Sequence, residues 1–343
     1  MAKLITPEIF QKNTAEDYLK AAIDTAEWID TLAIKTEYGR IWQALPEGQD
    51  GYREDVPLFT PKSMYDGSAG PYNGPVGEAY FLEDLYQVTG KQAYRDYVLY
   101  VADVLLEAAV TDERGLHWSD QEDITADGGF VVFLDILYRK TGIKKYLELA
   151  KEGLTYAMNI AVGDETGRLI PYQDHPVTGP TYDKYYLSTC HGPVGSTLAF
   201  RELYEITGEE IYRNWTIELS RGIVRAGAPE KHSWGFWNCQ CQCCGTAGIL
   251  EHFAAMYEYT GEKEFYAYMI RTADVMLSDS DHRTPGLRTW YDSWWRTIPT
   301  RVVSYPGLYV GVAGCASSLL RTYAALTGKK LTNLYEYHFF EKF

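Results

Sequence analysis

The chain has 343 residues, of which 46% are hydrophobic and 15% aromatic, and its formal net charge is -15. This composition excludes global disorder, because it supplies enough apolar surface for a large core, and the negative charge argues against nucleic acid, whose phosphates are bound by Lys and Arg. The sequence has no N-terminal signal-peptide pattern and no run of roughly 18 apolar residues, so we expect no membrane partner and a soluble, cytoplasmic protein.

The N-terminal part of the chain is expected to hold one helix and one long loop. The helix runs from about Ala15 to Leu32, and the loop, rich in Pro, Gly and Asp, runs from Leu45 to Gly70. A second long loop is expected from Asp164 to Lys184. Long loops in compact folds are more often functional than accidental.

A repeat organises the rest of the chain. Each copy starts with Gly-x-x-Gly, continues with apolar residues at helical spacing and ends in Thr-Gly. The second glycine and the Thr-Gly glycine are 13 residues apart in four copies and 14 apart in the last. The clear copies start at Gly74, Gly192, Gly245 and Gly311, and a degenerate copy runs from Gly129 to Gly142.

Glycines at both ends of an apolar segment predict a helix that starts where backbones crowd and ends in a left-handed cap. A more amphipathic segment follows each of the first four Thr-Gly turns, which indicates pairs of inner and outer helices. The expected outer helices are Tyr94 to Ala109, Tyr146 to Ile160, Tyr212 to Val224 and Phe265 to Leu277. Since the inner helices are too apolar to face solvent, we predict a closed, all-α (α/α) toroid of about five to six pairs, forming one domain over residues 1–343.

Cysteines precede two of the inner-helix starts. Cys190 and His191 lie directly before Gly192, and Cys243 and Cys244 lie directly before the next clear start. If all inner helices begin at the same end of the toroid, these cysteines converge at its mouth. Zinc takes thiolate ligands in tetrahedral geometry, and helix N-termini favour thiolates. We therefore predict that Cys190, Cys243 and Cys244 bind zinc (Zn2+); the alternative is that they fill small spaces beside glycines.

The other cysteines rank lower. Cys239 and Cys241 are additional or alternative ligands, but they lie outside the repeat register. Cys315 lies inside an inner helix and is predicted to be a core residue.

Three further features could carry chemistry. His191 has three open roles, as a metal ligand, a proton-transfer group or a hydrogen-bonded helix-start residue. Asp127 closes an acidic stretch that begins at Asp120, which is either a solvated loop or the source of an acid/base carboxylate. The aromatic run from Trp290 to Arg296 either packs a loop or offers a stacking platform for a sugar or peptide.

From about Met64 to Gly328 the chain resembles the lanthionine synthetase C-like family. The resemblance rests on Tyr-Tyr-Leu-Ser-Thr-Cys-His-Gly-Pro-Val-Gly at 185–195, on Gly-Phe-Trp-Asn-Cys-Gln-Cys-Gln-Cys-Cys-Gly-Thr-Ala-Gly at 235–248, and on the Thr-Gly turns. It implies an (α/α) toroid with zinc held by one cysteine and by a Cys-His pair in the next repeat. Cys190 matches the first ligand and Cys243 the second, whereas Cys244 stands in place of the histidine.

The chain departs from the family pattern in three ways. The family has seven helical pairs, whereas five clear inner helices are found here. Thr125 occupies the position of a histidine proposed as acid/base, and Thr189 replaces the tryptophan before the first ligand. These departures predict that any cyclisation is weak or restricted to a special substrate.

The resemblance implies a zinc-dependent enzyme of peptide thioether (lanthionine-type) cyclisation, or of related thiol addition or elimination. Its substrate would be a peptide or small-molecule thiol, and His191 or Asp127 would supply the proton. The alternatives are a carbohydrate-active enzyme on an (α/α) barrel and a catalytically inactive, zinc-containing peptide-binding module. The sequence leaves the oligomeric state open.

Overall fold

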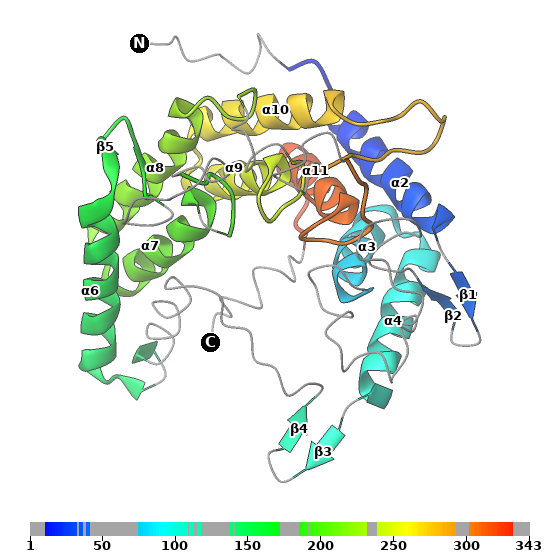
Figure 1. Cartoon of the computed structure of the whole chain (residues 1–343), viewed down its shortest axis with the longest axis horizontal. Helices are drawn as coiled ribbons and strands as arrows, with labels where there is room; N and C mark the ends of the chain where they lie inside the picture. The colour runs from blue at the N-terminus through cyan, green and yellow to red at the C-terminus, as the bar shows by residue number, and fades with distance from the viewer. Residues whose placement is uncertain are drawn as a thin grey trace.

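The structure is a computed structural model of the whole chain. It describes residues 11–32, 34–36, 39–41, 75–108, 110–112, 115–117, 138–139, 141–171, 185–190, 192–231, 239–292 and 302–331. Helices dominate these residues, and the described strands form short two-stranded hairpins. The fold is all-α, an (α/α) toroid, as the repeat predicted, and the described helices follow an arc in an inner and an outer layer (Figure 1).

The helices pair as the sequence predicted. Each pair is an inner helix packed against the outer helix that follows it. These pairs are α3 (Pro75–Thr89) with α4 (Gln92–Ala108), α7 (Pro193–Thr207) with α8 (Glu210–Arg225), and α9 (Thr246–Thr260) with α10 (Lys263–Ser278). The outer helix α6 (Lys144–Ile160) packs against α7.

The last inner helix takes its outer partner from the other end of the chain. Helix α11 (Val312–Thr327) packs against the N-terminal helix α2 (Ala15–Thr31) and lies between α9 and α3. The start of α2 is fixed by a capping box, in which Thr14 and Asp17 satisfy each other's backbone N–H groups. The N-terminal segment thus completes the last pair.

The Thr-Gly turns end the inner helices in one geometry. Gly208, Gly261 and Gly328 adopt φ of 67°, 68° and 69°, and each backbone N–H donates to a carbonyl four residues earlier. The preceding threonine also contributes: the hydroxyl of Thr260 donates to the carbonyl of Met256 at 2.7 Å. The predicted left-handed caps are therefore confirmed.

Backbones crowd at the opposite end of the inner helices. A Cβ added to Gly195 would lie 2.1 Å from the carbonyl oxygen of Thr189, and one added to Gly248 would lie 2.2 Å from that of Gln242. Gly314 in α11 is just as close to the chain six residues before it. The segment before each helix therefore folds back over the helix start, which only glycine permits. We call these three segments, residues 187–190, 239–244 and 305–310, the approach loops.

Short β-hairpins, which the repeat does not predict, follow three of the outer helices. They are β1 (Ile34–Thr36) with β2 (Gly39–Ile41), β3 (Val110–Asp112) with β4 (Gly115–His117), and β5 (Val162–Asp164) with β6 (Gly167–Leu169). The second long loop was expected to start at Asp164, but Asp164 is the last residue of β5, so the start of that segment is a hairpin. Strand β6 packs against α8, where Gly222 lies close to the carbonyl of Arg168. The loop from Leu45 to Gly70 and most of the degenerate repeat lie outside the described residues.

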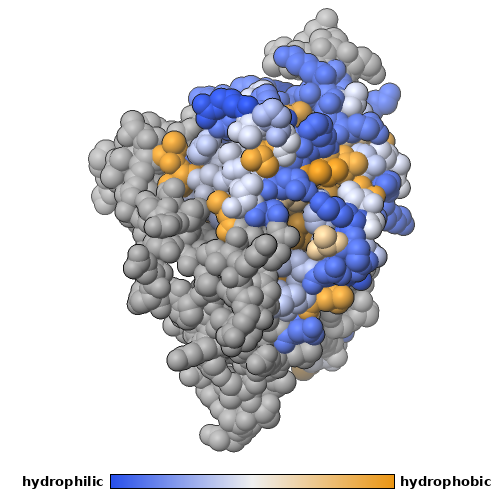
Figure 2. All heavy atoms as spheres, turned by 90° about the vertical axis from the view of Figure 1, so that its right-hand side faces the viewer, coloured by the Kyte–Doolittle hydropathy of each residue, from blue (hydrophilic) through white to orange (hydrophobic). Residues whose placement is uncertain are grey.

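The largest core cluster joins the inner helices α3, α9 and α11 to the outer helices α2 and α10. The described part of the face formed by α2 and α4 is mostly hydrophilic, with hydrophobic side chains scattered over it (Figure 2). Within the described part of the chain, no helix has the length and apolar character needed to cross a bilayer.

Candidate metal centre

The approach loops lie side by side at one end of the inner helices, and equivalent residues are joined by backbone hydrogen bonds. The N–H of Cys190 donates to the carbonyl of Cys243 at 3.1 Å, and the N–H of Cys243 donates to the carbonyl of Tyr309 at 2.9 Å. Each of these residues stands two positions before the first glycine of its repeat. The inner helices α7, α9 and α11 therefore begin at the same end, as the repeat predicted.

Polar side chains reinforce this ladder. The hydroxyl groups of Thr189 and Ser188 donate to the carbonyl of Gln242 at 2.9 and 3.2 Å. The side chain of Gln242 in turn donates to the hydroxyl of Ser318 on α11 at 3.1 Å. Thr189 therefore holds two approach loops together.

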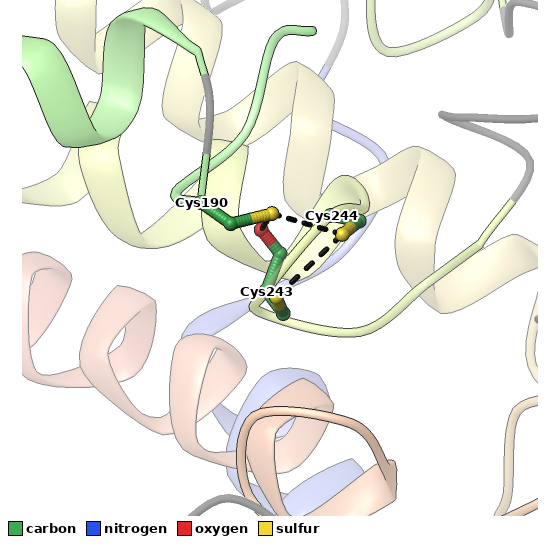
Figure 3. Close-up of side chains that lie close together, drawn as sticks. All are labelled: Cys190, Cys243 and Cys244. Carbon is green, nitrogen blue, oxygen red and sulfur yellow. Dashed lines mark hydrogen bonds between the residues drawn. The ribbon is translucent and has the colours of Figure 1, made fainter. Parts of the chain in front are cut away.

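Three cysteine sulfurs meet where the first two approach loops touch (Figure 3). The Sγ of Cys190 lies 3.0 Å from that of Cys244, which lies 3.5 Å from the Sγ of Cys243. All three sulfurs are within 4.8 Å of one another. The structure thus brings together the three residues named as ligands from the sequence.

The arrangement fits a tetrahedral zinc ion. A Zn–S bond of about 2.3 Å places two sulfurs of a tetrahedral site about 3.8 Å apart, so the sulfurs, at 3.0 and 3.5 Å, would have to move apart slightly to hold the ion. Sulfur donors also suit soft or borderline cations such as zinc. Among the described residues, no other group of three or more Cys, His, Asp or Glu side chains gathers in this way.

The three cysteine residues differ in exposure. Cys243 and Cys244 are 3% and 4% exposed, whereas Cys190 is only partly buried. Apolar side chains of the third approach loop, including Tyr305 and Val310, pack around the group. Cys190 is therefore the most exposed of the three residues.

That these sulfurs are thiolates, favoured by helix N-termini and a bound cation together, stays a prediction for the metal-loaded site; without the metal, the pKa values of Cys190 and Cys244 are raised. The pKa of Cys190 is raised, chiefly by its hydrogen bond with Cys243 and further by burial. The pKa of Cys244 is raised by its hydrogen bonds with Cys190 and Cys243. Several negative charges cannot share a buried site without a cation, so the thiols are expected to keep their protons in the metal-free protein. Metal binding here would therefore release protons.

The lower-ranked cysteines lie nearby but apart from the group of three. The Sγ atoms of Cys239 and Cys241 are 3.9 Å apart, and both side chains are buried. Cys315 is a core residue, as predicted, and its thiol donates to the carbonyl of Gln240 at 3.2 Å.

Several predicted functional residues lie outside the described residues. These are His191, Asp127, the rest of the acidic stretch from Asp120, and Thr125. The aromatic run is described only from Trp290 to Asp292. Trp290 itself is 1% exposed and its Nε1 donates to the carbonyl of Met276 at 2.7 Å, so Trp290 is a packing residue, whereas Tyr291 is exposed.

Asp292 is a residue at this site that the sequence analysis did not single out. Its carboxylate accepts a short hydrogen bond from the N–H of Gln240 at the start of the second approach loop. Burial raises its pKa to about 6, although the amides of Gln240 and Cys241 oppose the shift. No signal in the sequence could have found it, because it belongs to no repeat and its partner is 52 residues away.

Comparison with solved structures gives remote similarities. The chain is 16% identical to the Lin0763 protein of Listeria innocua, covering 71% of this chain and 68% of that one, with a TM-score of 0.39. It is 12% identical to the GH76A alpha-1,6-mannanase of Salegentibacter sp. HEL1_6, covering 90% and 99%, with a TM-score of 0.41. It is 12% identical to an unsaturated glucuronyl hydrolase of Streptococcus agalactiae, covering 96% and 95%, with a TM-score of 0.42.

No curated protein matches the chain in sequence. The model of the family described as "Lanthionine synthetase C-like protein" matches residues 127–330, which is more than half of the chain. That segment contains the first two approach loops with all three clustered cysteines, and the third with α11. The chain belongs to the lanthionine synthetase C-like family.

Proposed function

We propose that this chain is a zinc-dependent enzyme that adds a cysteine thiol of a peptide, or a small-molecule thiol, to the β-carbon of a dehydroamino acid, forming a thioether. The observation that carries the proposal is the convergence of three sulfurs from two successive approach loops. Membership of the lanthionine synthetase C-like family supports thiol chemistry at this position.

Cys190, Cys243 and Cys244 would hold the ion, and Cys190 would border the side from which a substrate approaches. When bound, Zn2+ would lower the pKa of a substrate thiol and keep it nucleophilic at neutral pH. Three sulfur ligands leave one tetrahedral position, which a substrate thiol or His191 would occupy. A three-thiolate set carries more negative charge than two thiolates and an imidazole, which weakens Lewis acidity but favours a nucleophilic sulfur.

The proposed reaction consumes one thiol and one carbon–carbon double bond. The thiol loses its proton, a bond forms between its sulfur and the β-carbon, and the π electrons of the double bond move to the α-carbon. The α-carbon then takes up a proton, so the thioether product has the same atoms as the reactants. We propose His191 or Asp127 as the group that delivers this proton.

The test uses the zinc-loaded protein and a peptide that contains one dehydroalanine and one cysteine. We expect the free thiol, counted by alkylation and mass spectrometry, to disappear with the wild type and to persist with Cys190→Ala. His191→Ala and Asp127→Asn are compared at equal zinc content, and the variant that slows the reaction identifies the proton donor.

Because Thr125 and Thr189 stand where the family pattern has histidine and tryptophan, we expect a slow reaction with generic precursor peptides. If the zinc-loaded wild type consumes no thiol from peptides or small molecules, the proposal is wrong. In that case a cobalt(II)-substituted protein whose spectrum does not respond to added thiol would identify a closed, structural metal site in a binding module.

A further inference from the structure

Asp292 joins the second approach loop to the segment that follows α10. Its side chain is 4% exposed, and its carboxylate accepts from the N–H of Gln240. Its own backbone is fixed by two hydrogen bonds with Val303, at 2.7 and 2.9 Å. Val303 packs among the cysteines of the approach loops. The carboxylate is therefore held at the start of the second approach loop by a backbone that is itself paired with Val303.

The partner of Asp292 is anchored at several other points. The carbonyl of Gln240 accepts from the thiol of Cys315 at 3.2 Å and from the N–H of Ala247 at 3.0 Å. The side chain of Gln240 donates to the carboxylate of Asp279 at 3.2 Å. Gln240 is thus the fixed point from which the chain runs to Cys243 and Cys244.

A buried carboxylate at this position destabilises the fold unless it is compensated, because removing the charge from water costs free energy. The backbone N–H groups of the second approach loop provide this compensation. The loop has no helix or strand of its own at Gln240 and Cys241, and both amides act on the carboxylate. Consecutive backbone N–H groups form a concave site that prefers a negatively charged acceptor. A charged acceptor also makes stronger hydrogen bonds than a neutral one.

We propose that Asp292 is a positioning residue for the three-cysteine group: by accepting from the amide of Gln240 at the start of the second approach loop, it holds Cys243 and Cys244 beside Cys190 before any metal arrives. The proposal rests on the metal binding assigned above. It goes beyond that assignment because it names a residue that contacts neither metal nor substrate and acts through the loop.

The test compares two buried aspartates. Asp292→Asn keeps the shape of the side chain but removes its charge and one acceptor. Asp274→Asn is the matched control, because Asp274 is also buried and accepts from Tyr18, Asn13 and Lys12, but it ties the N-terminal segment to α10. Zinc affinity is measured by competition with a chromophoric chelator, and the sulfur-to-cobalt absorption is recorded after cobalt(II) substitution.

We expect Asp292→Asn to lower zinc affinity by about 10- to 100-fold, the usual effect of losing a group that orients metal ligands. Its cobalt spectrum should also change. Asp274→Asn should lose stability but keep the wild-type affinity and spectrum. Wild-type zinc affinity and spectrum in Asp292→Asn would overturn the proposal.

A metal-free measurement separates this proposal from the proposed function. In the apo protein, alkylation of Cys243 and Cys244 should be faster in Asp292→Asn than in the wild type or in Asp274→Asn. That result supports the positioning role even if the wild type binds no zinc, whereas equal rates contradict it. If Asp292→Asn does not fold, amide hydrogen exchange of Gln240 and Cys241 is measured in the apo wild type, where strong protection is expected and rapid exchange would refute the role.

Discussion

The two ends of the inner helices follow opposite rules. At the Thr-Gly end, α7, α9 and α11 share the same residues and the same geometry, and the capping glycines stand in open space. At the other end the backbone path is again repeated, but the side chains differ. Cys190, Cys243 and Tyr309 occupy equivalent positions there and are linked through their backbones. The repeat thus fixes the backbone positions at this end, whereas the side chains at those positions differ and determine what the site can bind.

A Gly→Ala substitution should therefore lower the free energy of unfolding by different amounts at the two ends. At the approach-loop end an added Cβ would clash with a backbone carbonyl oxygen, and a change of side-chain rotamer cannot relieve that clash. At the Thr-Gly end the cost is conformational alone, because nothing lies within 4 Å of the added atom. This difference can be tested on a single helix, α9.

The largest effect is expected for Gly248→Ala. The new Cβ would lie 2.2 Å from both the carbonyl oxygen of Gln242 and the hydroxyl of Ser188, so the backbone of the second approach loop must shift and the Ser188 hydroxyl must turn away. We expect a loss of more than about 4 kcal/mol in the free energy of unfolding, the range reached by severe core overpacking. Urea denaturation checks this, and a loss below that of Gly261→Ala would contradict the comparison.

A pH effect of intermediate size is expected between the two ends, at His252 in the middle of α9. Its Nε2 lies 2.8 Å from the hydroxyl of Ser220, and burial, aided by Arg201 and Arg321, lowers its pKa from 6.5 to about 3. The unfolded chain binds a proton at His252 below pH 6.5, but the folded chain does not until about pH 3. Its contribution to stability is therefore complete above pH 6.5 and is lost as the pH falls toward 3.

Denaturation of the wild type and of His252→Gln across this pH range measures that contribution. The wild type should lose its stability advantage over the variant by a few kcal/mol on acidification. Parallel pH profiles for the two proteins would show that folding leaves the pKa of His252 unchanged, and would contradict this prediction.

The smallest effect is expected for Gly261→Ala at the Thr-Gly end of α9. Gly261 has φ of 68° with open space around it, so alanine has only to adopt a left-handed conformation. We expect a loss of about 1 to 2 kcal/mol, the cost of that conformation for an L-residue, and no change in metal binding. Urea denaturation together with a zinc titration checks both parts. A loss of zinc affinity would show that the two ends are coupled.

The repeat made much of the fold and the central group of the site predictable. Glycine spacing gives the inner helices and their caps, and because helical repeats place equivalent residues alike, it also brings Cys190 to Cys243 and Cys244. The β-hairpins were missed because three-residue strands carry too little periodicity to be seen. The thiol pKa values and the contacts of Asp292 depend on segments distant in the sequence, which no local pattern encodes.

That the chain unfolds as one domain stays a prediction, tested by a single calorimetric transition.

The central claim is that one metal ion is bound by the cysteines that the repeat aligns. The most direct measurement is elemental analysis of the wild type, Cys190→Ala, Cys239→Ala and Cys241→Ala after dialysis against a mild chelator. We predict about one zinc per chain in the wild type and in the last two variants, and near-complete loss in Cys190→Ala, because removing one thiolate from a three-ligand site lowers affinity by orders of magnitude. Full metal in Cys190→Ala, with loss in Cys239→Ala or Cys241→Ala, would place the site within the second approach loop and contradict the account.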